Sequence, residues 1–468
     1  MATSKSTLSK SILSLTILGL FVAVFVGIFV ALFGATVGEH YGMLLALPVT
    51  MIIFFLFLLD RYSLFYLIIL SRASIDHVLE ATRLGSMGIG AVLNALVIIM
   101  AMIAIFQQPK TLWNVLKQTW LPFLAIVFLT LYIAPNFYLA LKSFLALLSY
   151  ASIFILSIAV IKSEADYGRW IRAVLYSSIV PVIYGFIDLA SGGYHGPESE
   201  GLRISSTFAH PNIFAFYLVL MISLSFYFYK TKEQYVSVFV RRTLPIYIFI
   251  MLALLILTKT RSAWASCAVF FTMYALLYER KYLLYVLLAP VVALMIPEMR
   301  DRILDLGQGN EVVNYSQLNS YAWRKLIWQD GLNFMNPSHY FFGYGIDAFK
   351  IKSVDFFTMS GGHEHGAHSV FVQLFFETGA LGLVAYIWIH FKTAKMLISY
   401  YQKNKLMIFT TLMTLLEFSF EAYADNMLDY LSYIWYFWFV LGATYAFTLL
   451  QPAETNISKL NLSSLKIK

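Results

Sequence analysis

The sequence predicts an all-α, polytopic helical membrane protein with about 12–14 transmembrane helices and a large periplasmic loop. Hydrophobic residues make up 60% of the 468 residues and charged residues only 12%, whereas soluble domains carry about 25% charged residues. Mean hydropathy is +0.73. The apolar residues lie in long blocks with almost no charge, a pattern typical of bilayer-spanning segments. Because hydrocarbon cannot hydrogen-bond the backbone, we expect each block to be a helix.

The apolar blocks define the expected spans in order along the chain. The first block is longer than the apolar core of a secretory signal, so we interpret it as a retained helix. A short run at 62–72 (YSLFYLIILSR) is either a short or half-inserted helix or an interfacial segment. The longer blocks are 11–33, 42–59, 89–106, 119–134, 139–160, 169–190, 212–229, 244–258, 262–278, 282–296, 369–391, 406–423 and 431–450.

Lys and Arg recur in alternate connections between these blocks, and this alternation marks the cytoplasmic side. An even number of spans would also place the N-terminal lysines inside, which favours 14 spans over 13. The net charge of +8 lies at helix ends rather than on one face, so it does not indicate nucleic acid. The single cysteine, Cys267, lies within an apolar block and excludes a disulfide framework and a thiolate metal site.

Two long connections on the outer side suggest where function is located, because long loops in compact proteins are usually functional. They are 191–211 and the polar, Gly-rich segment 297–368. We therefore divide the chain into an N-terminal transmembrane bundle (1–190), central helices with Arg-bearing outer loops (191–296), the large periplasmic loop with amphipathic segments (297–368), C-terminal transmembrane helices (369–450) and a cytoplasmic tail (451–468).

Three arginines fall on the side that should be poor in them. Arg203 precedes the span that starts at 212, and Arg261 lies with Lys259 in a tight turn, TKTRSAW. Arg324 belongs to NSYAWRKLIW, which we expect to form an amphipathic helix at the outer interface. Arg203 and Arg261 have two interpretations, an anchor for lipid headgroups or a ligand for a substrate anion, whereas Arg324 is expected on a solvated or interfacial helix face.

The segment GGHEHGAHSVFVQLFFETG holds His363, His365 and His368 immediately before a span. Three close histidines raise the possibility of zinc, but their spacing on a Gly-rich loop does not match one helix face. A single His acting as a general base is the favoured hypothesis, since imidazole titrates near neutral pH. Glu377, in the same stretch, is either a helix-interior carboxylate paired with a cation or part of the site.

Five short motifs occur in order over roughly residues 200–390. They are R-x-x-x-T-F-x-H-P-N (Arg203 to Asn212), T-R-S (around Arg261), R-x-x-x-W (Arg324 to Trp328), G-x-G-x-x-x-F (Gly343 to Phe349) and A-H-S-x-x-x-Q-x-x-x-E-x-G (Ala367 to Gly379). In this order they resemble the superfamily of O-antigen ligases and Wzy-type O-antigen and exopolysaccharide polymerases. SRASID at 71–76 is similar to the exopolysaccharide polymerases of this group. Ser369 is a departure, because the family often has Asn after this His.

The resemblance implies a metal-independent glycosyltransferase, without nucleotide or other cofactor, in the bacterial inner membrane with its active site facing the periplasm. It implies an undecaprenyl-diphosphate-linked glycan as donor and a sugar hydroxyl of a glycan or of lipid A–core as acceptor. Membrane lipids, a flippase and chain-length regulator proteins would be its partners. Carried over by motif, His368 would be catalytic and Arg203 and Arg261 would bind the diphosphate. Arg324, His365, His363, Glu377 and Asn212 would support them.

The chemistry agrees with these residue types. A diphosphate leaving group gains negative charge, which guanidinium groups can bind bidentately, and one base opposite the leaving group implies a single displacement with inversion. We favour a repeat-unit polymerase over a ligase that attaches glycan to lipid A–core. A polysaccharide or lipid-linked oligosaccharide transporter is the alternative from another class, but the sequence lacks the internal repeats that transporters usually show.

Overall fold

The computed structural model describes residues 52–81, 83–84, 87–193, 202–231, 235–295 and 318–450, with residues 300 and 304. The expected span 11–33, most of the span 42–59 and the tail 451–468 lie outside the described residues. Within the described part the secondary structure is helical, except for a short hairpin of β1 (Arg83–Leu84) and β2 (Met87–Gly88).

The helices follow the order of the apolar blocks. The N-terminal part contains α3 (Arg61–Ser71), α4 (Asp76–Ala81), α5 (Ile89–Gln107), the π-helical turn η1 (Pro109–Trp113), α6 (Asn114–Gln118), α7 (Leu121–Thr130), the 3-10 turn η2 (Leu131–Ile133), α8 (Phe137–Val160), α9 (Glu164–Tyr176) and α10 (Ile179–Ala190). The central part contains α11 (Pro211–Lys230), α12 (Val238–Leu257), α13 (Arg261–Leu277) and α14 (Tyr282–Met295). The last part contains α16 (Ser320–Phe334), η6 (Pro337–His339), α17 (Ala348–Phe356), α18 (Val370–Ile398), α19 (Lys405–Ala424), η7 (Met427–Asp429) and α20 (Leu431–Leu450).

Eight helices in the described residues are long and apolar enough to cross a membrane, or nine if the bent pair Pro109–Gln118 and Leu121–Ile133 is one span. This confirms the all-α, polytopic membrane class. The ambiguous run at 62–72 is helical, as the 11 residues of α3. The expected spans 262–278 and 282–296 are helices of 17 and 14 residues, shorter than the ~20 residues that hydrocarbon requires.

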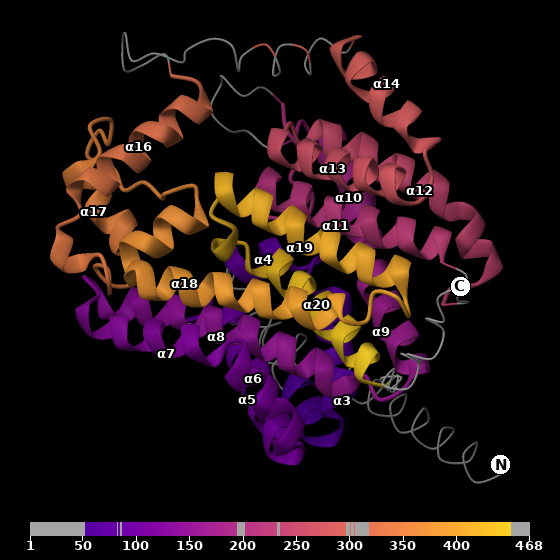
Figure 1. Cartoon of the computed structure of the whole chain (residues 1–468), viewed down its shortest axis with the longest axis horizontal. Coiled ribbons are helices and arrows are strands. Elements are labelled where there is room, and N and C mark those ends of the chain that lie inside the picture. Colours follow the sequence, from indigo (N-terminus) through magenta and orange to yellow (C-terminus); the bar gives the residue numbers. More distant parts are fainter. Residues whose placement is uncertain are drawn as a thin grey trace, which may run out of the picture.

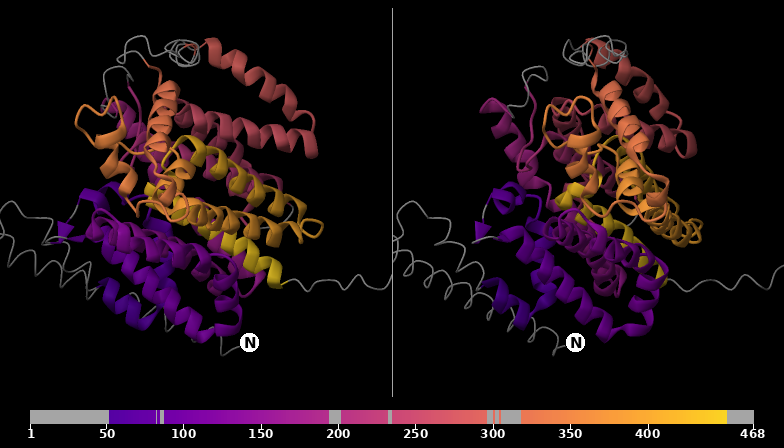
Figure 2. Two further views of the ribbon diagram at one scale, coloured as in Figure 1. Left: turned by 60° about the vertical axis from the view of Figure 1, so that its left-hand side comes forward. Right: turned by 90° about the vertical axis from the view of Figure 1, so that its left-hand side faces the viewer.

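The long helices form three layers (Figures 1 and 2). The layer of α18, α19 and α20 lies between the layer of α5 to α8 and the layer of α11 to α13. In this arrangement α20 packs against α8, α18 against α7, and α19 against α11 and α13. The last three helices therefore form the centre of the bundle, although they come at the end of the chain.

α18 is broken near its start, at Gly379, where φ is 65° and ψ is −170°. The break allows the 340–345 segment to hydrogen-bond to the helix backbone: Tyr340 O accepts from Ala380 N (2.7 Å), and Gly345 N donates to Glu377 O (2.9 Å). A Cβ on Gly343 would lie 2.3 Å from the Glu377 carbonyl carbon. The G-x-G motif is thus explained by close backbone packing.

The segment before α18 forms a small subdomain at one end of the helices, seen at the left of Figure 1. It consists of α16, η6 and α17 and has its own apolar core, which includes Ile327, Trp328 and Phe349. α16 packs on α17 and on α18. NSYAWRKLIW is therefore helical, as expected, with its N-cap at Asn319. This subdomain lies over the end of the bundle where the predicted site residues gather.

Candidate functional site

Arg203 is at the centre of a buried polar junction. Its side chain is only 6% exposed. Nε donates to the carbonyl of Thr258 (2.8 Å), and Nη2 donates to Oδ1 of Asn212 (2.7 Å) and to Oγ1 of Thr260 (3.2 Å). Arg203 thereby connects its own loop, the start of α11 and the turn between α12 and α13.

Hydrogen bonds and a helix cap fix the conformation of the loop between Arg203 and Asn212. Oδ2 of Asp188, on α10, accepts 2.8 Å hydrogen bonds from the backbone N–H groups of Ser205 and Ser206. Pro211 is the first residue of α11, where its missing N–H costs nothing. His210 caps the helix, since its Nδ1 accepts from the N–H of Asn212 (3.1 Å). The H-P-N triplet therefore fixes the position of Asn212.

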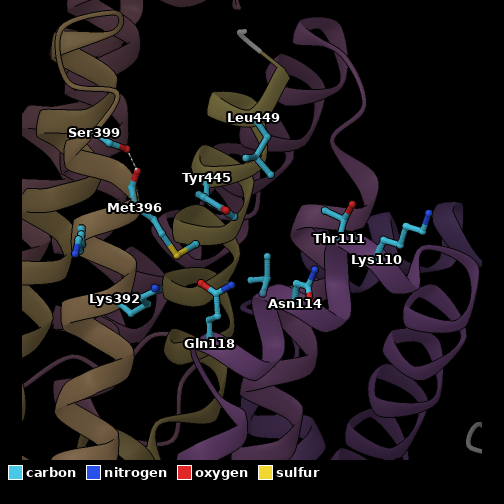
Figure 3. A pocket seen from close by; sticks show the side chains of 11 residues that line it. Lys110, Thr111, Asn114, Gln118, Lys392, Met396, Ser399, Tyr445 and Leu449 are labelled. Carbon is cyan, nitrogen blue, oxygen red and sulfur yellow. Dashed lines mark hydrogen bonds between the residues drawn. The ribbon is translucent and has the colours of Figure 1, made fainter. Parts of the chain in front are cut away.

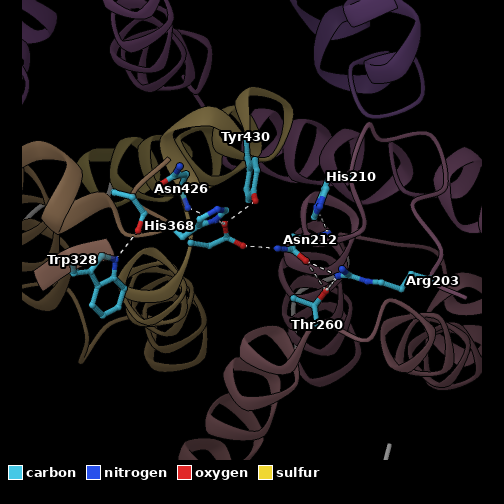
Figure 4. A network of polar contacts seen from close by, with 10 residues as sticks. Arg203, His210, Asn212, Thr260, Trp328, His368, Asn426 and Tyr430 are labelled. Carbon is cyan, nitrogen blue, oxygen red and sulfur yellow. Dashed lines mark hydrogen bonds and ion pairs between the residues drawn. The ribbon is translucent and has the colours of Figure 1, made fainter. Parts of the chain in front are cut away.

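Asn212 connects Arg203 to Asp425, the residue that follows α19, and Figure 4 shows the polar contacts between Arg203 and His368. Nδ2 of Asn212 donates to Oδ2 of Asp425 (2.6 Å), and the Tyr430 hydroxyl donates to Oδ1 (2.8 Å). Nδ1 of His368 lies 3.8 Å from the same Oδ1, which is beyond hydrogen-bond length but within ion-pair distance. Arg203, Asn212, Asp425 and His368 therefore form one continuous polar chain.

The Asp425 side chain is ionised in this environment. Burial alone would raise the pKa of this carboxyl, because a charge is poorly solvated there. The interactions with His368, the positive charge of Arg324 and the Tyr430 hydroxyl outweigh burial and lower the pKa to about 2. Asp425 consequently presents a fixed negative charge to His368 at neutral pH.

His368 is the exposed end of this polar chain, and its backbone conformation is strained. Its φ is 47°, in the left-handed region that side chains other than Gly rarely adopt. Nε1 of Trp328 donates a 2.6 Å hydrogen bond to the carbonyl of Ala367, and the Trp323 ring lies 5.6 Å from the His368 ring. The His368 side chain remains 40% exposed. Such strain is found where the surrounding structure imposes a functional geometry.

Two further arginines lie in this region, Arg261 at the start of α13 and Arg324 on α16. Nη2 of Arg261 donates to Oγ of Ser320 (2.6 Å), at the start of α16. Arg324 lies one helical turn before Trp328, and its positive charge helps to lower the pKa of Asp425. The Arg324 guanidinium is half-buried and forms no hydrogen bond or ion pair with a residue that the structure describes. The R-x-x-x-W motif thus combines a charge beside the site with the indole that holds Ala367.

The structure separates the other two histidines and Glu377 from the polar chain. His363 is exposed, whereas Nε2 of His365 lies 3.1 Å from the carbonyl of Ser360 and its ring contacts Trp323. Glu377 is buried within α18, where Oε1 accepts from the N–H of Phe349 (3.4 Å). Across the described residues, no group of three or more His, Cys, Asp or Glu is arranged to hold a metal ion.

All members of the polar chain lie at the same end of the bundle. Asn212 is at the start of α11, and Thr258 and Thr260 lie between the end of α12 and the start of α13. His368 precedes α18, and Asp425 follows α19. These helix ends are the ones that the alternation of Lys and Arg assigns to the outer side.

Sequence reasoning missed Asp425 and its hydrogen-bond donor Tyr430. A signal was present, because the connection ADNMLDY at 424–430 carries two acidic residues between two spans on the outer side. The connection is short, however, and its pairing with His368 depends on how α18 packs beside α19.

Comparison with known families agrees with the motif order. Residues 246–387 match the model of the family described as O-antigen ligase, which confirms the resemblance to the superfamily of O-antigen ligases and Wzy-type polymerases. The match includes Arg261, Arg324 and His368, and it ends before Asp425. No match was found among curated proteins.

Proposed function

We propose that the protein is a repeat-unit polymerase of exopolysaccharide or O-antigen, which transfers an undecaprenyl-diphosphate-linked glycan to an acceptor sugar hydroxyl on the periplasmic face. The membrane fold and the match to the O-antigen ligase family support a ligase or polymerase type of activity. The observation that carries the site assignment is the polar chain from Arg203 through Asn212 and Asp425 to His368.

His368 acts as the general base in this proposal. Its ring is accessible, and the ionised Asp425 lies 3.8 Å from Nδ1. A carboxylate on that side favours the tautomer with the proton on Nδ1, which leaves Nε2 free to accept a proton. The same carboxylate stabilises the imidazolium that forms when the acceptor hydroxyl is deprotonated. Asp425 is then a positioning residue that acts through His368.

The transfer is a single displacement. The acceptor oxygen forms a bond to the anomeric carbon while the bond from this carbon to the diphosphate oxygen breaks. The bonding electron pair leaves with undecaprenyl diphosphate, and the hydroxyl proton moves to Nε2 of His368. With one base opposite the leaving group, the anomeric configuration is inverted.

The arginines divide into two roles. Arg261 and Arg324 are partly exposed at the base of α16 and can bind the diphosphate as its charge grows, because guanidinium stays protonated and donates in pairs. Arg203 is buried, and its printed hydrogen bonds go to Thr258, Asn212 and Thr260. It supports the diphosphate site through its charge and by positioning Asn212.

The SRASID segment, whose resemblance to exopolysaccharide polymerases favours a polymerase over a ligase in this proposal, packs against the loop that carries Arg203. Arg72 forms a buried ion pair with Asp76 (2.6 Å), and the buried Ala73 lies in the turn between α3 and α4. Oγ1 of Thr207 donates to the Ala73 carbonyl (2.7 Å). The motif that resembles exopolysaccharide polymerases is therefore part of the scaffold that holds Arg203 in place.

The test is an assay of the purified protein with a synthetic undecaprenyl-diphosphate-linked repeat unit, with and without lipid A–core. A polymerase forms a ladder of products from the donor alone, and NMR of the new linkage should show inversion. Product only in the presence of lipid A–core would instead identify a ligase. Absence of any product, together with movement of the lipid-linked donor across liposomes, would favour the transporter alternative and overturn the proposal.

A further inference from the structure

A pocket lined by several polar side chains (Figure 3) lies near the ends of α18 and α20, at the opposite end of the bundle from His368. Its volume is about 430 Å³, within the range of roughly 300–1,000 Å³ typical of small-molecule sites. The pocket lies between α6, α18 and α20. Figure 3 shows Lys110 and Lys392 on its two sides, with Asn114 and Gln118 between them. Lys395 also lines it.

The pocket carries a positive charge that no acidic residue of its lining neutralises. Its lining contains three lysines and, within the described residues, no Asp or Glu. Lys110, Lys392 and Lys395 form no ion pair with any carboxylate of the described part. Lysines nearby at this end of the bundle behave differently, since Lys230 and Lys281 both pair with Glu279. Three cations that line one pocket without a carboxylate indicate an anionic ligand.

The depth of the pocket matches the headgroup level of the leaflet opposite to the candidate active site. α20 begins at Leu431, beside Tyr430 of the candidate site, and Leu449, which lines the pocket, lies 18 residues further along this helix (449 − 431). At 1.5 Å per residue this is roughly 27 Å, close to the thickness of the hydrocarbon core. Basic pockets between helices at this level bind anionic lipid headgroups.

A bend in the chain creates the space. Pro109–Gln118 and Leu121–Ile133 meet at 61°, so α6 does not continue in the line of α7. The side chain of Asn114 and that of Gln118 face the pocket (Figure 3), and amides can donate hydrogen bonds to phosphate oxygens. The pocket thus combines neutral donors with the three ammonium groups.

We propose that this pocket binds the phosphate ester of an anionic phospholipid headgroup, in the leaflet opposite to the candidate active site. The ligand chemistry is a phosphate diester or monoester held by Lys110, Lys392 and Lys395. This site is separate from the glycan transfer proposed above and does not depend on it.

The experiment measures lipid binding by native mass spectrometry and thermal unfolding of the full-length protein in detergent. The probes are phosphatidylglycerol, the zwitterionic phosphatidylcholine, and soluble glycerol 1-phosphate. The variant carries Lys110→Gln, Lys392→Gln and Lys395→Gln together. The control is Lys117→Gln, which removes a lysine from α6 that stands over Trp113 and does not line the pocket. Triple Lys→Arg replacement tests whether charge is sufficient.

Phosphatidylglycerol should bind and stabilise the wild type, the Lys117→Gln variant and the triple Arg variant. Each neutralised lysine should weaken affinity about fivefold, so the triple Gln variant should lose on the order of a hundredfold. Glycerol 1-phosphate could instead stabilise the wild type as well as the lipid does, with the triple Gln variant losing this effect. In that case the pocket binds a phosphate ester as proposed, but the ligand is a soluble phosphate ester rather than a lipid headgroup. Equal stabilisation of wild type and triple Gln variant, or equal effects of the two lipids, would overturn the proposal. Polymer synthesis can fail without changing these results.

Discussion

Asn212 donates a 2.6 Å hydrogen bond from Nδ2 to Oδ2 of Asp425 across a separation of 213 residues. This contact joins two parts of the site that the sequence shows separately. On one side Asn212 is fixed by Arg203, and on the other Asp425 faces His368. The charge that orients the proposed base is therefore held by the segment that bears the first of the five motifs, R-x-x-x-T-F-x-H-P-N.

His368 should be the histidine whose loss stops the reaction. A general base contributes roughly a hundredfold to ten-thousandfold in rate. The transfer rate of the His368→Ala variant should therefore be lower than that of the wild type by this factor in the assay with purified protein. His363→Ala, at an exposed position, should stay near wild type, and His365→Ala should show a modest loss through the packing of Trp323. Equal loss in all three variants, with inhibition by EDTA and rescue by zinc, would instead identify a metal site.

Asp425→Asn should keep the shape of the side chain and remove its charge. We expect kcat/KM to fall roughly tenfold to a hundredfold, because a charge-assisted contact to the base is lost. Asp355→Asn, at an exposed position of α17, is the matched control and should leave activity unchanged. Wild-type activity in Asp425→Asn would remove this residue from the mechanism.

The same residue predicts how stability depends on pH. The pKa of Asp425 is lowered to about 2, whereas an unfolded Asp titrates at about 3.9. The charged carboxylate therefore stabilises the fold above about pH 4, and this contribution is lost as pH falls toward 2. Thermal unfolding in detergent should show a gap in stability between wild type and Asp425→Asn at pH 5. The gap should close as pH falls from about 4 toward 2, and a gap that stays open there would contradict this assignment.

Arg261→Lys and Arg324→Lys should each lose roughly tenfold to a hundredfold in kcat/KM, because an ammonium cannot reproduce the two-donor geometry of guanidinium. Lys325→Gln, next to Arg324 and exposed, should be neutral. Membrane insertion should be unaffected in all three variants. If the Lys variants keep near-normal polymer synthesis, these arginines are headgroup anchors, a role that Lys fills equally well.

Trp328→Phe tests whether the indole hydrogen bond to Ala367 positions His368. Removal of the Nε1–H donor should reduce kcat about tenfold with little change in KM. Trp388→Phe is a matched control, because its indole donates a 2.9 Å hydrogen bond to the Gln118 carbonyl on α6, away from the candidate site. A similar kcat loss in both variants would show a general destabilisation rather than a local effect.

Orientation in the membrane can be measured by cysteine labelling of intact cells. The native Cys267 is buried, so it should give little background. Glu364→Cys, in the exposed loop before His368, should react with a membrane-impermeant maleimide. Gln402→Cys, between α18 and α19, should react only after the cells are opened. The reverse pattern would place every proposed catalytic residue in the cytoplasm and defeat the site assignment.

The sequence by itself determined the class of the protein and most of its helices. Helices in hydrocarbon must satisfy their own backbone hydrogen bonds, so an apolar block such as 212–229 or 431–450 specifies a helix without reference to the rest of the chain. The motif order likewise indicated the superfamily, because the residues that mark it lie within short stretches. His368 stood out for the same local reason, as one of three histidines before a span.

Tertiary structure alone decided the partners of these residues. Asp425 becomes the partner of His368 only because α18 packs beside α19, and Arg203 is buried because its loop closes over the turn between α12 and α13. The break of α18 at Gly379 likewise depends on the 340–345 segment that fills it. Such contacts are set by packing between segments distant in the chain, and the local residue pattern that predicts helices carries no information about which of their ends meet.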